Sequence, residues 1–533
     1  MIPGPLVAAA FTAVVLAGFA WVSVDGLWRP DAFDYAQQAR ELARGHGFSS
    51  LQAIYALHLD FLLEHGLTAD AWPNLHRFPL PPLAIAAGFR VLGEGLLAVV
   101  AYGVFFHAAT SALLFAWTRS ALGVAPAVAA VFLFTCNGAM LESACSGLSE
   151  PPVVFFFTLA LYAWWRGRER GRAGYWLLAG AALGLATLAR TNALFAAPLF
   201  GVALWVDGRR SLAGAQVRLR RGLVCGGLFS LGLFAVLTPW MLRNLEVAGT
   251  PFFSLHSFFL LPSGTGLSWE KWDLSVPWVR EQTSPLEFAR EHAGLVFAKW
   301  RRHMLALLLD APTLAGTFLV FPAAFAALLL PLGARLRGLA WFALTAFVAN
   351  AVLVSFTDFY FDKYSFHFLP VMILLAVAVL GWGLDRLVVG RAHALAFALF
   401  VLAMADLPGS LAAFEQVPAR TARIERPHFA FLREVTGPDD VILSDQSYAV
   451  AWEAERRSVR LHYDRLGDGT SVLGALTISD EYLPIAGVYL SREYLREPGR
   501  QQVLRDTLER LPRFRRVFRN VHEFENGALY FSR

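Results

Sequence analysis

Long apolar runs dominate the first four hundred residues of the chain. Runs of roughly 17 to 25 residues are long enough to cross the hydrocarbon core of a bilayer as helices. The pattern predicts about eleven spans, over residues 5–24, 95–118, 124–141, 152–165, 174–190, 193–206, 223–242, 311–332, 338–356, 367–388 and 392–407. The first run has neither a basic start nor a small-residue cleavage site, so we expect a retained helix rather than a signal peptide.

Two long polar segments interrupt these runs and are predicted to be outer loops, over residues 25–94 and 243–310. In the first loop, residues 31–44 (DAFDYAQQARELAR) place their alanines on one stripe, which predicts a weakly amphipathic, interfacial helix along the membrane surface. Residues 79–92 form an apolar stretch that is too short to cross alone, so we expect a re-entrant or interfacial segment there.

The end of the chain has a different pattern, with short helix-like and strand-like runs separated by turn signals. Of the 124 residues in 410–533, 36 are charged (18 basic and 18 acidic), against 51 of the 409 upstream residues. The pattern predicts helices, strands and a closing hairpin over residues 429–435, 441–444, 448–455, 487–491, 500–511, 514–521 and 528–531. A transmembrane domain at 1–409 followed by a small soluble α/β domain at 410–533 is therefore expected.

Arginines indicate how the chain lies in the membrane. The upstream part has 28 basic residues (46 in the chain less 18 in the tail), and half of them fall in five loops. These loops lie at or near residues 119, 166–172, 209–221, 335–337 and 386–391. Basic loops stay on the cytoplasmic side. All five share one face if the N-terminus is cytoplasmic, and an odd number of spans then places the tail outside.

Carboxylates on the outer side are candidates for proton transfer. Asp31 follows the first span at the start of a helix, where the helix dipole favours its charged form. It could accept a proton from a substrate hydroxyl or simply cap the helix. Asp34, one turn further, is expected to be a solvated surface charge. Glu150, followed by two prolines, either points into a cleft beneath the first loop or is an exposed loop acid.

Three cations, Arg190, Arg243 and Lys363, lie at the outer ends of predicted spans. Each could snorkel to lipid headgroups, but guanidinium and ammonium groups also suit phosphate. Their recurrence at three span ends predicts a groove that holds an anion. His76 and Arg77 precede the short apolar stretch, and a lone histidine there is more often a hydrogen-bonded loop residue than a metal ligand.

Several common motifs are absent from the sequence. There is no HExxH, paired-histidine or CxxC spacing, so no dedicated metal site is predicted. There is also no Walker A, GxSxG or GxGxxG motif, which argues against nucleotide-driven transport, serine-hydrolase chemistry and a Rossmann-type donor site.

Six segments together resemble a known class of membrane enzymes. They are residues 30–49 (PDAFDYAQQARELARGHGFS), 76–83 (HRFPLPPL), 149–151 (SEP), 188–192 (LARTN), 239–251 (PWMLRNLEVAGTP) and 363–370 (KYSFHFLP). Their order is similar to that of the GT-C class of polytopic glycosyltransferases. The resemblance is strongest to the branch of the aminoarabinose-to-lipid A transferases and the protein O-mannosyltransferases. Two departures are Ala32, where that branch often has an acidic residue, and Lys363, where arginine is commoner.

The resemblance implies an inverting transferase that moves a sugar from a polyprenyl-phosphate carrier to an acceptor hydroxyl of a lipid, glycan or protein. Asp31 matches the catalytic aspartate of that class in the first outer loop, which implies a general base there, and Glu150 is our second catalytic candidate. The donor phosphate would be held by Arg190, Arg243, Lys363 and Tyr364, and the acceptor or pocket would involve Asp34, His76 and Arg77. No cofactor is assigned with certainty, and a divalent cation remains open. The expected location is a bacterial-type inner (plasma) membrane, and nucleic acid is not an expected partner.

Two other functional classes remain as alternatives. A lipid or glycan transporter would place charges near the bilayer midplane, on broken helices in two similar halves. A non-catalytic membrane subunit would use its tail to bind a partner, and Asp31 is the residue that argues directly against it. A larger transferred unit, as in a polymerase or ligase, would keep the same fold.

Overall fold

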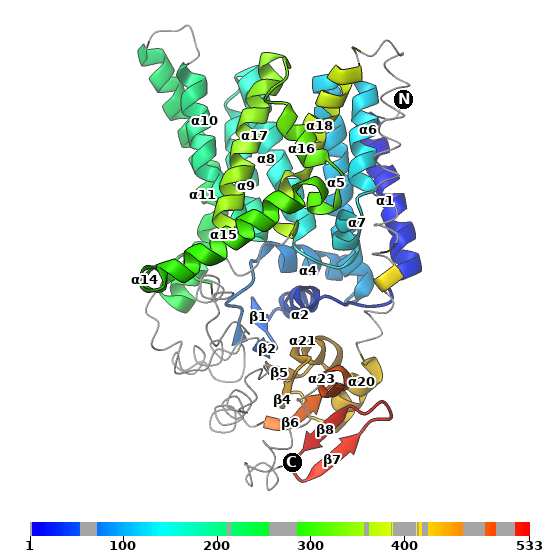
Figure 1. Ribbon diagram of the computed structural model, residues 1–533. Helices are drawn as coiled ribbons and strands as arrows, with labels where there is room; N and C mark the ends of the chain where they lie inside the picture. The colour runs from blue at the N-terminus through cyan, green and yellow to red at the C-terminus, as the bar shows by residue number, and fades with distance from the viewer. Residues whose placement is uncertain are drawn as a thin grey trace.

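The computed structural model describes residues 3–53, 72–209, 215–254, 285–356, 362–384, 386, 412, 415–417, 425–461, 485–496 and 518–533. Figure 1 shows a bundle of long helices above a smaller mixed sheet, with helices α2 (Pro30–Arg44) and α4 (Leu80–Leu92) between them. The polytopic helical architecture predicted from the apolar runs is confirmed in outline.

The bundle is built from helices that correspond to most of the predicted spans. They are α1 (Gly4–Ser23), α5 (Leu96–Leu122), α6 (Val124–Thr135), α8 (Glu150–Arg170), α9 (Gly174–Ala189), α10 (Ala197–Arg209), α11 (Ala215–Ala248), α16 (Val320–Ala326), α17 (Ala334–Val354) and α18 (Leu369–Leu384). Among the described residues, five helices are long and apolar enough to cross a membrane, or seven if two bent pairs each count as one span. The span predicted at 392–407 lies outside the described residues, so the count of eleven stays a prediction.

Two predicted straight spans are bent. The pair formed by α6 and α7 (Gly138–Cys145) bends by 61°, and the pair formed by residues 293–316 and α16 bends by 108°. Asn137 serves both breaks, because its side chain accepts the Met140 N–H at 2.9 Å and donates to the carbonyls of Ala315 and Gly316 at 3.0 Å. Backbone groups freed inside a membrane need such partners. A single polar side chain therefore stabilises two interruptions that the apolar pattern does not reveal.

Glycines allow α9 and α11 to pack closely. A Cβ atom at Gly180 would lie 1.9 Å from the Phe229 carbonyl oxygen, and one at Gly232 would lie 2.2 Å from that of Leu177. Small residues permit this kind of backbone contact between membrane helices. At the end of α8 remote from Glu150, Glu169 pairs at 3.0 Å with Arg335, which lies at the start of α17. Two of the basic loops used for the orientation argument therefore meet at that end.

Helix α2 is not an exposed surface helix. It begins with Pro30 in its first turn and ends at Gly45, whose φ of 89° suits glycine. Every residue from Ala32 to Glu41 is buried, which corrects the prediction of a weakly amphipathic helix lying on the membrane. The reason is that α4 covers one side of α2, while helix α21 (Ser447–Ala449) and the π-helix Val450–Ala454 pack on another.

The outer segments contain further elements. In the first, β1 (Ser49–Ser50) pairs with β3 (Trp72–Pro73). In the second, α14 (Pro285–Glu291) and α15 (Ala293–Asp310) run obliquely along the lower end of the bundle in Figure 1. Residues 255–284 of that predicted loop lie outside the described residues.

The sheet below the bundle has six strands in the order β2–β5–β4–β6–β8–β7. Their bounds are β2 (Gln52–Ala53), β5 (Arg457–Arg460), β4 (Val441–Ser444), β6 (Ile485–Leu490), β8 (Leu529–Ser532) and β7 (Asn520–Glu523). Strands β2, β5, β4 and β6 are parallel to one another. Strand β8 runs antiparallel to both of its neighbours, β6 and β7. Helices α20 (Arg426–Val435), α21 and α23 (Arg492–Arg496) accompany them. We call the described part of residues 425–533 the C-terminal unit.

Strand β2 belongs to the first outer loop, yet it completes the sheet of the C-terminal unit. Ala53 pairs with Val459 in parallel register. The short strand was not predicted, because its side-chain pattern is indistinguishable from that of a polar loop. The helix predicted at 500–511 and the proposed boundary near residue 410 fall on residues outside those described, so the domain division stays a prediction.

Candidate active site

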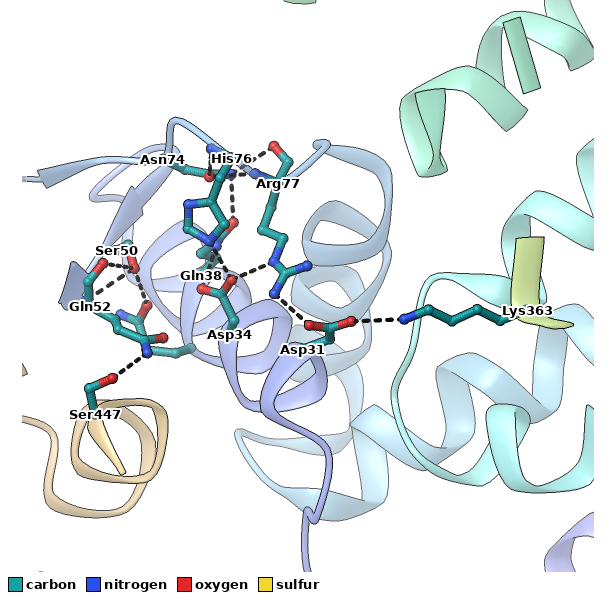
Figure 2. Close-up of polar contacts among 11 residues, drawn as sticks. Asp31, Asp34, Gln38, Ser50, Gln52, Asn74, His76, Arg77, Lys363 and Ser447 are labelled. Carbon is teal, nitrogen blue, oxygen red and sulfur yellow. Dashed lines mark hydrogen bonds and ion pairs between the residues drawn. The ribbon is translucent and has the colours of Figure 1, made fainter. Parts of the chain in front are cut away.

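Asp31 is a partly accessible carboxylate between two cations. Its side chain is 35% exposed, and its Oδ1 atom accepts a hydrogen bond from Arg77 Nη2 at 2.7 Å. Its Oδ2 atom lies 3.6 Å from Lys363 Nζ, and Figure 2 shows the lysine reaching it from the bundle. Burial raises the pKa of Asp31, but the charges of Arg77, Lys363 and Arg190 outweigh burial and hold that pKa well below its usual range. Asp31 is therefore ionised and partly accessible to solvent.

Asp34 lies one turn further along α2 and is buried, with its side chain 1% exposed. Its Oδ2 atom accepts hydrogen bonds from Arg77 Nε at 2.6 Å and His76 Nε2 at 2.7 Å, while Gln38 donates to Oδ1 at 2.8 Å. Burial raises its pKa, but His76 and Arg77 bring the net shift below the usual value. The prediction of a solvated surface charge is wrong, because Asp34 anchors Arg77 from inside the protein.

A tight turn presents His76 and Arg77 to α2. The Asn74 side-chain oxygen accepts the backbone N–H groups of His76 at 3.1 Å and Arg77 at 2.9 Å, as in an Asx turn. Its amide nitrogen donates to Gln38 Oε1 at 2.7 Å. His76 is thus the hydrogen-bonded loop residue that its isolation predicted. Gln38 is a residue of the site that sequence reasoning missed.

Glu150 and Arg190 form another ion pair of the site, in addition to those of Asp31 and Asp34. Glu150 starts α8 with its side chain 2% exposed, and Arg190 donates to it at 2.6 Å. The Arg190 guanidinium also lies over the Tyr364 ring, 4.6 Å from its centroid. The exposed-acid alternative for Glu150 is wrong. Its contacts make it a partner that fixes Arg190, and a direct catalytic role remains a prediction.

Arg243 lies in a small pocket that also includes His76 and Arg77. The pocket is lined by Asn74, Leu75, His76, Arg77, Phe78, Trp240, Arg243, Asn244, Phe253 and Ser254. The Arg243 guanidinium stacks over Trp240 at 4.8 Å and donates to Asn244 Oδ1 at 3.2 Å. The three cations predicted at span ends therefore fall into two groups: Lys363 and Arg190 act on Asp31, and Arg243 lines the pocket. Arg77 belongs to both.

No metal centre is evident in the part of the chain that the structure describes. No group of three or more histidine, cysteine, aspartate or glutamate side chains there is placed to hold a metal ion. The neighbours of Asp31 are cations, which would repel a divalent metal rather than help to bind one. The possibility of a divalent cation elsewhere stays untested.

Comparison with known sequences gives consistent results. A family model described as dolichyl-phosphate-mannose-protein mannosyltransferase matches residues 76–240. The chain is 28% identical over 230 residues to the undecaprenyl phosphate-alpha-4-amino-4-deoxy-L-arabinose arabinosyl transferase of Edwardsiella ictaluri (strain 93-146), covering 40% of this chain and 36% of the relative. The enzyme of that name from Enterobacter sp. (strain 638) is 25% identical over 263 residues, with 47% and 42% covered. The matched region thus spans well under half the length of either relative.

Solved structures share the fold over almost the whole chain. ArnT from Cupriavidus metallidurans, solved bound to undecaprenyl phosphate, superposes with a TM-score of 0.60 at 14% identity, covering 98% of this chain and 97% of that one. The Archaeoglobus fulgidus oligosaccharyltransferase gives a TM-score of 0.60 at 11% identity, covering 98% and 73%. At such low sequence identities these structures are evidence for the fold alone. The chain is therefore similar in fold to these structures and, over the matched segments, similar in sequence to the aminoarabinose transferases and to the protein mannosyltransferase model.

Proposed function

We propose that this protein is a glycosyltransferase that moves a sugar from a polyprenyl-phosphate carrier to an acceptor hydroxyl on the outer face of the membrane. The observation that carries the proposal is Asp31, an ionised and partly exposed carboxylate held between Arg77 and Lys363. The names of the sequence relatives, which act on an undecaprenyl-phosphate sugar, support a donor of that class. A bacterial-type inner membrane agrees with the apolar helices and with these bacterial relatives.

The reaction needs one base and several cations. The acceptor oxygen attacks the anomeric carbon while Asp31 takes the hydroxyl proton. The bond from the anomeric carbon to the phosphate oxygen breaks, and the polyprenyl phosphate leaves with the electron pair. Attack from the side opposite the phosphate inverts the anomeric carbon. Fixed cations stabilise the growing phosphate charge, so no strong general acid is required.

We place the donor phosphate beside Arg77 and Arg243. Lys363 would then lie on the side of the phosphate that faces Asp31. Arg77 and Arg243 line the same pocket, and Arg77 also touches Asp31, which brings the leaving group next to the base. Arg190 pairs with the buried Glu150, lies over the Tyr364 ring and does not line that pocket. Its contribution is to hold Tyr364 and the surroundings of Asp31.

The transporter alternative receives less support from the same observations. Broken helices are present, but the residues at the break within each bent pair, 136–137 in one and 317–319 in the other, are uncharged. The ionised side chains of the candidate site gather instead beside α2, at one end of the bundle. A transporter would need such groups along its path through the membrane.

The proposal predicts an unusual pH dependence. Asp31 acts as a base in its charged form, which is lost only as the pH falls through its lowered pKa. Sugar release by purified protein from a polyprenyl-phosphate sugar should therefore persist from neutral pH to below about pH 3.9, the ordinary aspartate pKa. Thermal unfolding at each pH separates loss of the base from loss of the fold. An acid limb near pH 6.5 would contradict the assignment and indicate a histidine base.

Arg243→Ala should weaken donor binding. Loss of a charge-assisted hydrogen bond costs about 1.5 to 3 kcal/mol, or roughly a 10- to 100-fold rise in Kd. The measurement is titration of purified protein in lipid nanodiscs with undecaprenyl phosphate. Arg335→Ala is the matched control, because that side chain is 73% exposed and lies at the opposite end of the bundle. Unchanged affinity of the Arg243 variant would show that this arginine only stacks on Trp240.

A further inference from the structure

The C-terminal unit contacts the chain on both sides of α2. Before the helix, Arg426 Nη2 donates a hydrogen bond to the Asp25 carbonyl oxygen at 2.6 Å. After the helix, the Ser458 N–H donates to the Leu51 carbonyl at 2.8 Å where β2 joins β5. Gln52 Nε2 also donates to Ser447 Oγ at 2.7 Å, a contact visible at the left of Figure 2. Both ends of the segment that carries Asp31 are therefore attached to the same unit.

A third attachment lies on α2 itself. The Arg40 guanidinium stacks 3.7 Å from the Trp452 ring centroid and donates to the Trp452 carbonyl oxygen at 2.8 Å. Its side chain is 9% exposed. A buried arginine is costly unless it is paired and hydrogen-bonded, so this contact is specific rather than incidental.

Arg44 joins the unit to the bundle as well. It makes two hydrogen bonds to Glu94, at 3.2 and 2.7 Å, in the turn between α4 and α5. Its remaining Nη1 group donates to Glu455 of the C-terminal unit at 2.9 Å. One arginine on α2 thus connects three parts of the protein that are far apart in the sequence.

The groups around Asp31 come from separate elements. Arg77 lies in the turn before α4, and Lys363 lies in the short helix Asp362–Tyr364 that follows α17. The distances from Asp31 to these cations therefore depend on how α2 lies relative to the bundle. With α4 on one side of the helix and the C-terminal unit on another, removal of either support would free α2 to shift.

We propose that the C-terminal unit is a positioning element for the reaction. Arg40 and Arg44 attach α2 to this unit and thereby fix the position of Asp31. The proposal rests on the transferase function given above. Arg40 and Arg44 are positioning residues, since neither touches the residues assigned to the base or the donor phosphate. The unit needs no ligand of its own in this role.

The test compares Arg40→Ala with Arg433→Ala in the full-length protein. Arg433 pairs with the same Glu455 that Arg44 contacts, at 3.3 Å, but it is 56% exposed and lies on α20 of the C-terminal unit, which makes it the matched control. Arg40→Ala should lower kcat for sugar release by about 10- to 100-fold, the cost of misplacing a reacting group by about 1 Å. Affinity for undecaprenyl phosphate should not change. The acid limb of the pH profile should move to higher pH, because Asp31 would lie farther from the cations that lower its pKa.

Hydrogen exchange provides a readout that does not depend on activity. Amides of α2 should lose protection in Arg40→Ala and keep it in Arg433→Ala. Arg44→Gln, at a more exposed position, is a milder second variant if Arg40→Ala does not fold. Unchanged α2 exchange, or a fall in activity that matches the loss of folded protein with no movement of the acid limb, would overturn the proposal. Wild-type protein that releases no sugar would instead refute the transferase function, and α2 exchange would still test the attachment.

Discussion

Asp31→Asn should reduce sugar release by about 10²- to 10⁴-fold, the usual contribution of a positioned general base. Asparagine has nearly the same shape but cannot take a proton from the acceptor hydroxyl. Binding of undecaprenyl phosphate should persist or become tighter, because Arg77 and Lys363 would no longer share their charge with a carboxylate. The measurement is sugar release from several polyprenyl-phosphate sugars by purified protein in nanodiscs, with lipid titration in parallel.

Asp25→Asn is the control for this substitution. Asp25 is an exposed aspartate in the segment before α2, and it contacts Arg426 through its backbone oxygen rather than its side chain. Its replacement should leave sugar release unchanged. Full activity in Asp31→Asn would remove Asp31 from the reaction. Loss of lipid binding together with activity would assign Asp31 to the donor site rather than to proton transfer.

Arg77→Met should lower both stability and activity. Arg77 is the cation that holds both aspartates of α2, through Nη2 to Asp31 and Nε to Asp34. Its removal leaves Asp34 as a buried carboxylate with only His76 to balance it, and breaking a buried pair in this way costs about 3 to 5 kcal/mol of unfolding free energy. Thermal unfolding of the purified protein should show a clear decrease in midpoint, and sugar release should fall with the loss of a phosphate-binding cation.

A double substitution separates these two effects. Adding Asp34→Asn removes the unpaired buried charge, so the double variant should recover part of the lost stability. Sugar release should stay low, because the cation beside Asp31 is still missing. A double variant that is no more stable than Arg77→Met would show that Arg77 does not act through Asp34. Recovery of activity along with stability would show that Arg77 has only a structural role.

The sequence predicted the parts of the site that depend on position relative to a span. Asp31 after the first span, and Arg190, Arg243 and Lys363 at span ends, could be placed on one side because charges within apolar runs are costly and collect at their ends. The structure brings Lys363 into contact with Asp31, puts Arg190 near enough for its charge to lower the pKa of Asp31, and puts Arg243 in the adjoining pocket. Arg77 links the cations around Asp31 to the pocket that contains Arg243. Its place in the structure could not be predicted from the short polar segment in which it lies.

Tertiary contacts decided what the sequence could not. Asp34 looks like a surface charge on a helix with an alanine stripe, and its burial follows from the turn at Asn74 and from the elements that cover α2. Glu150 has the same local pattern whether it is free or paired, and its partner Arg190 is 40 residues away. Asn137 gives no periodic signal, yet it supports two breaks in the bundle.

The pairing of β2 with β5 has a consequence for how the protein assembles during synthesis. Arg40 and Gln52 emerge from the ribosome early, but their partners Trp452 and Ser447 follow 412 and 395 residues later. Contacts between such distant residues form late, because the chain between them must be made and ordered first. The bundle can insert as its spans are translated, while the segment that carries Asp31 waits for its partners Ser447, Trp452 and strand β5. A nascent chain should therefore become competent for the reaction only after β5 has been translated.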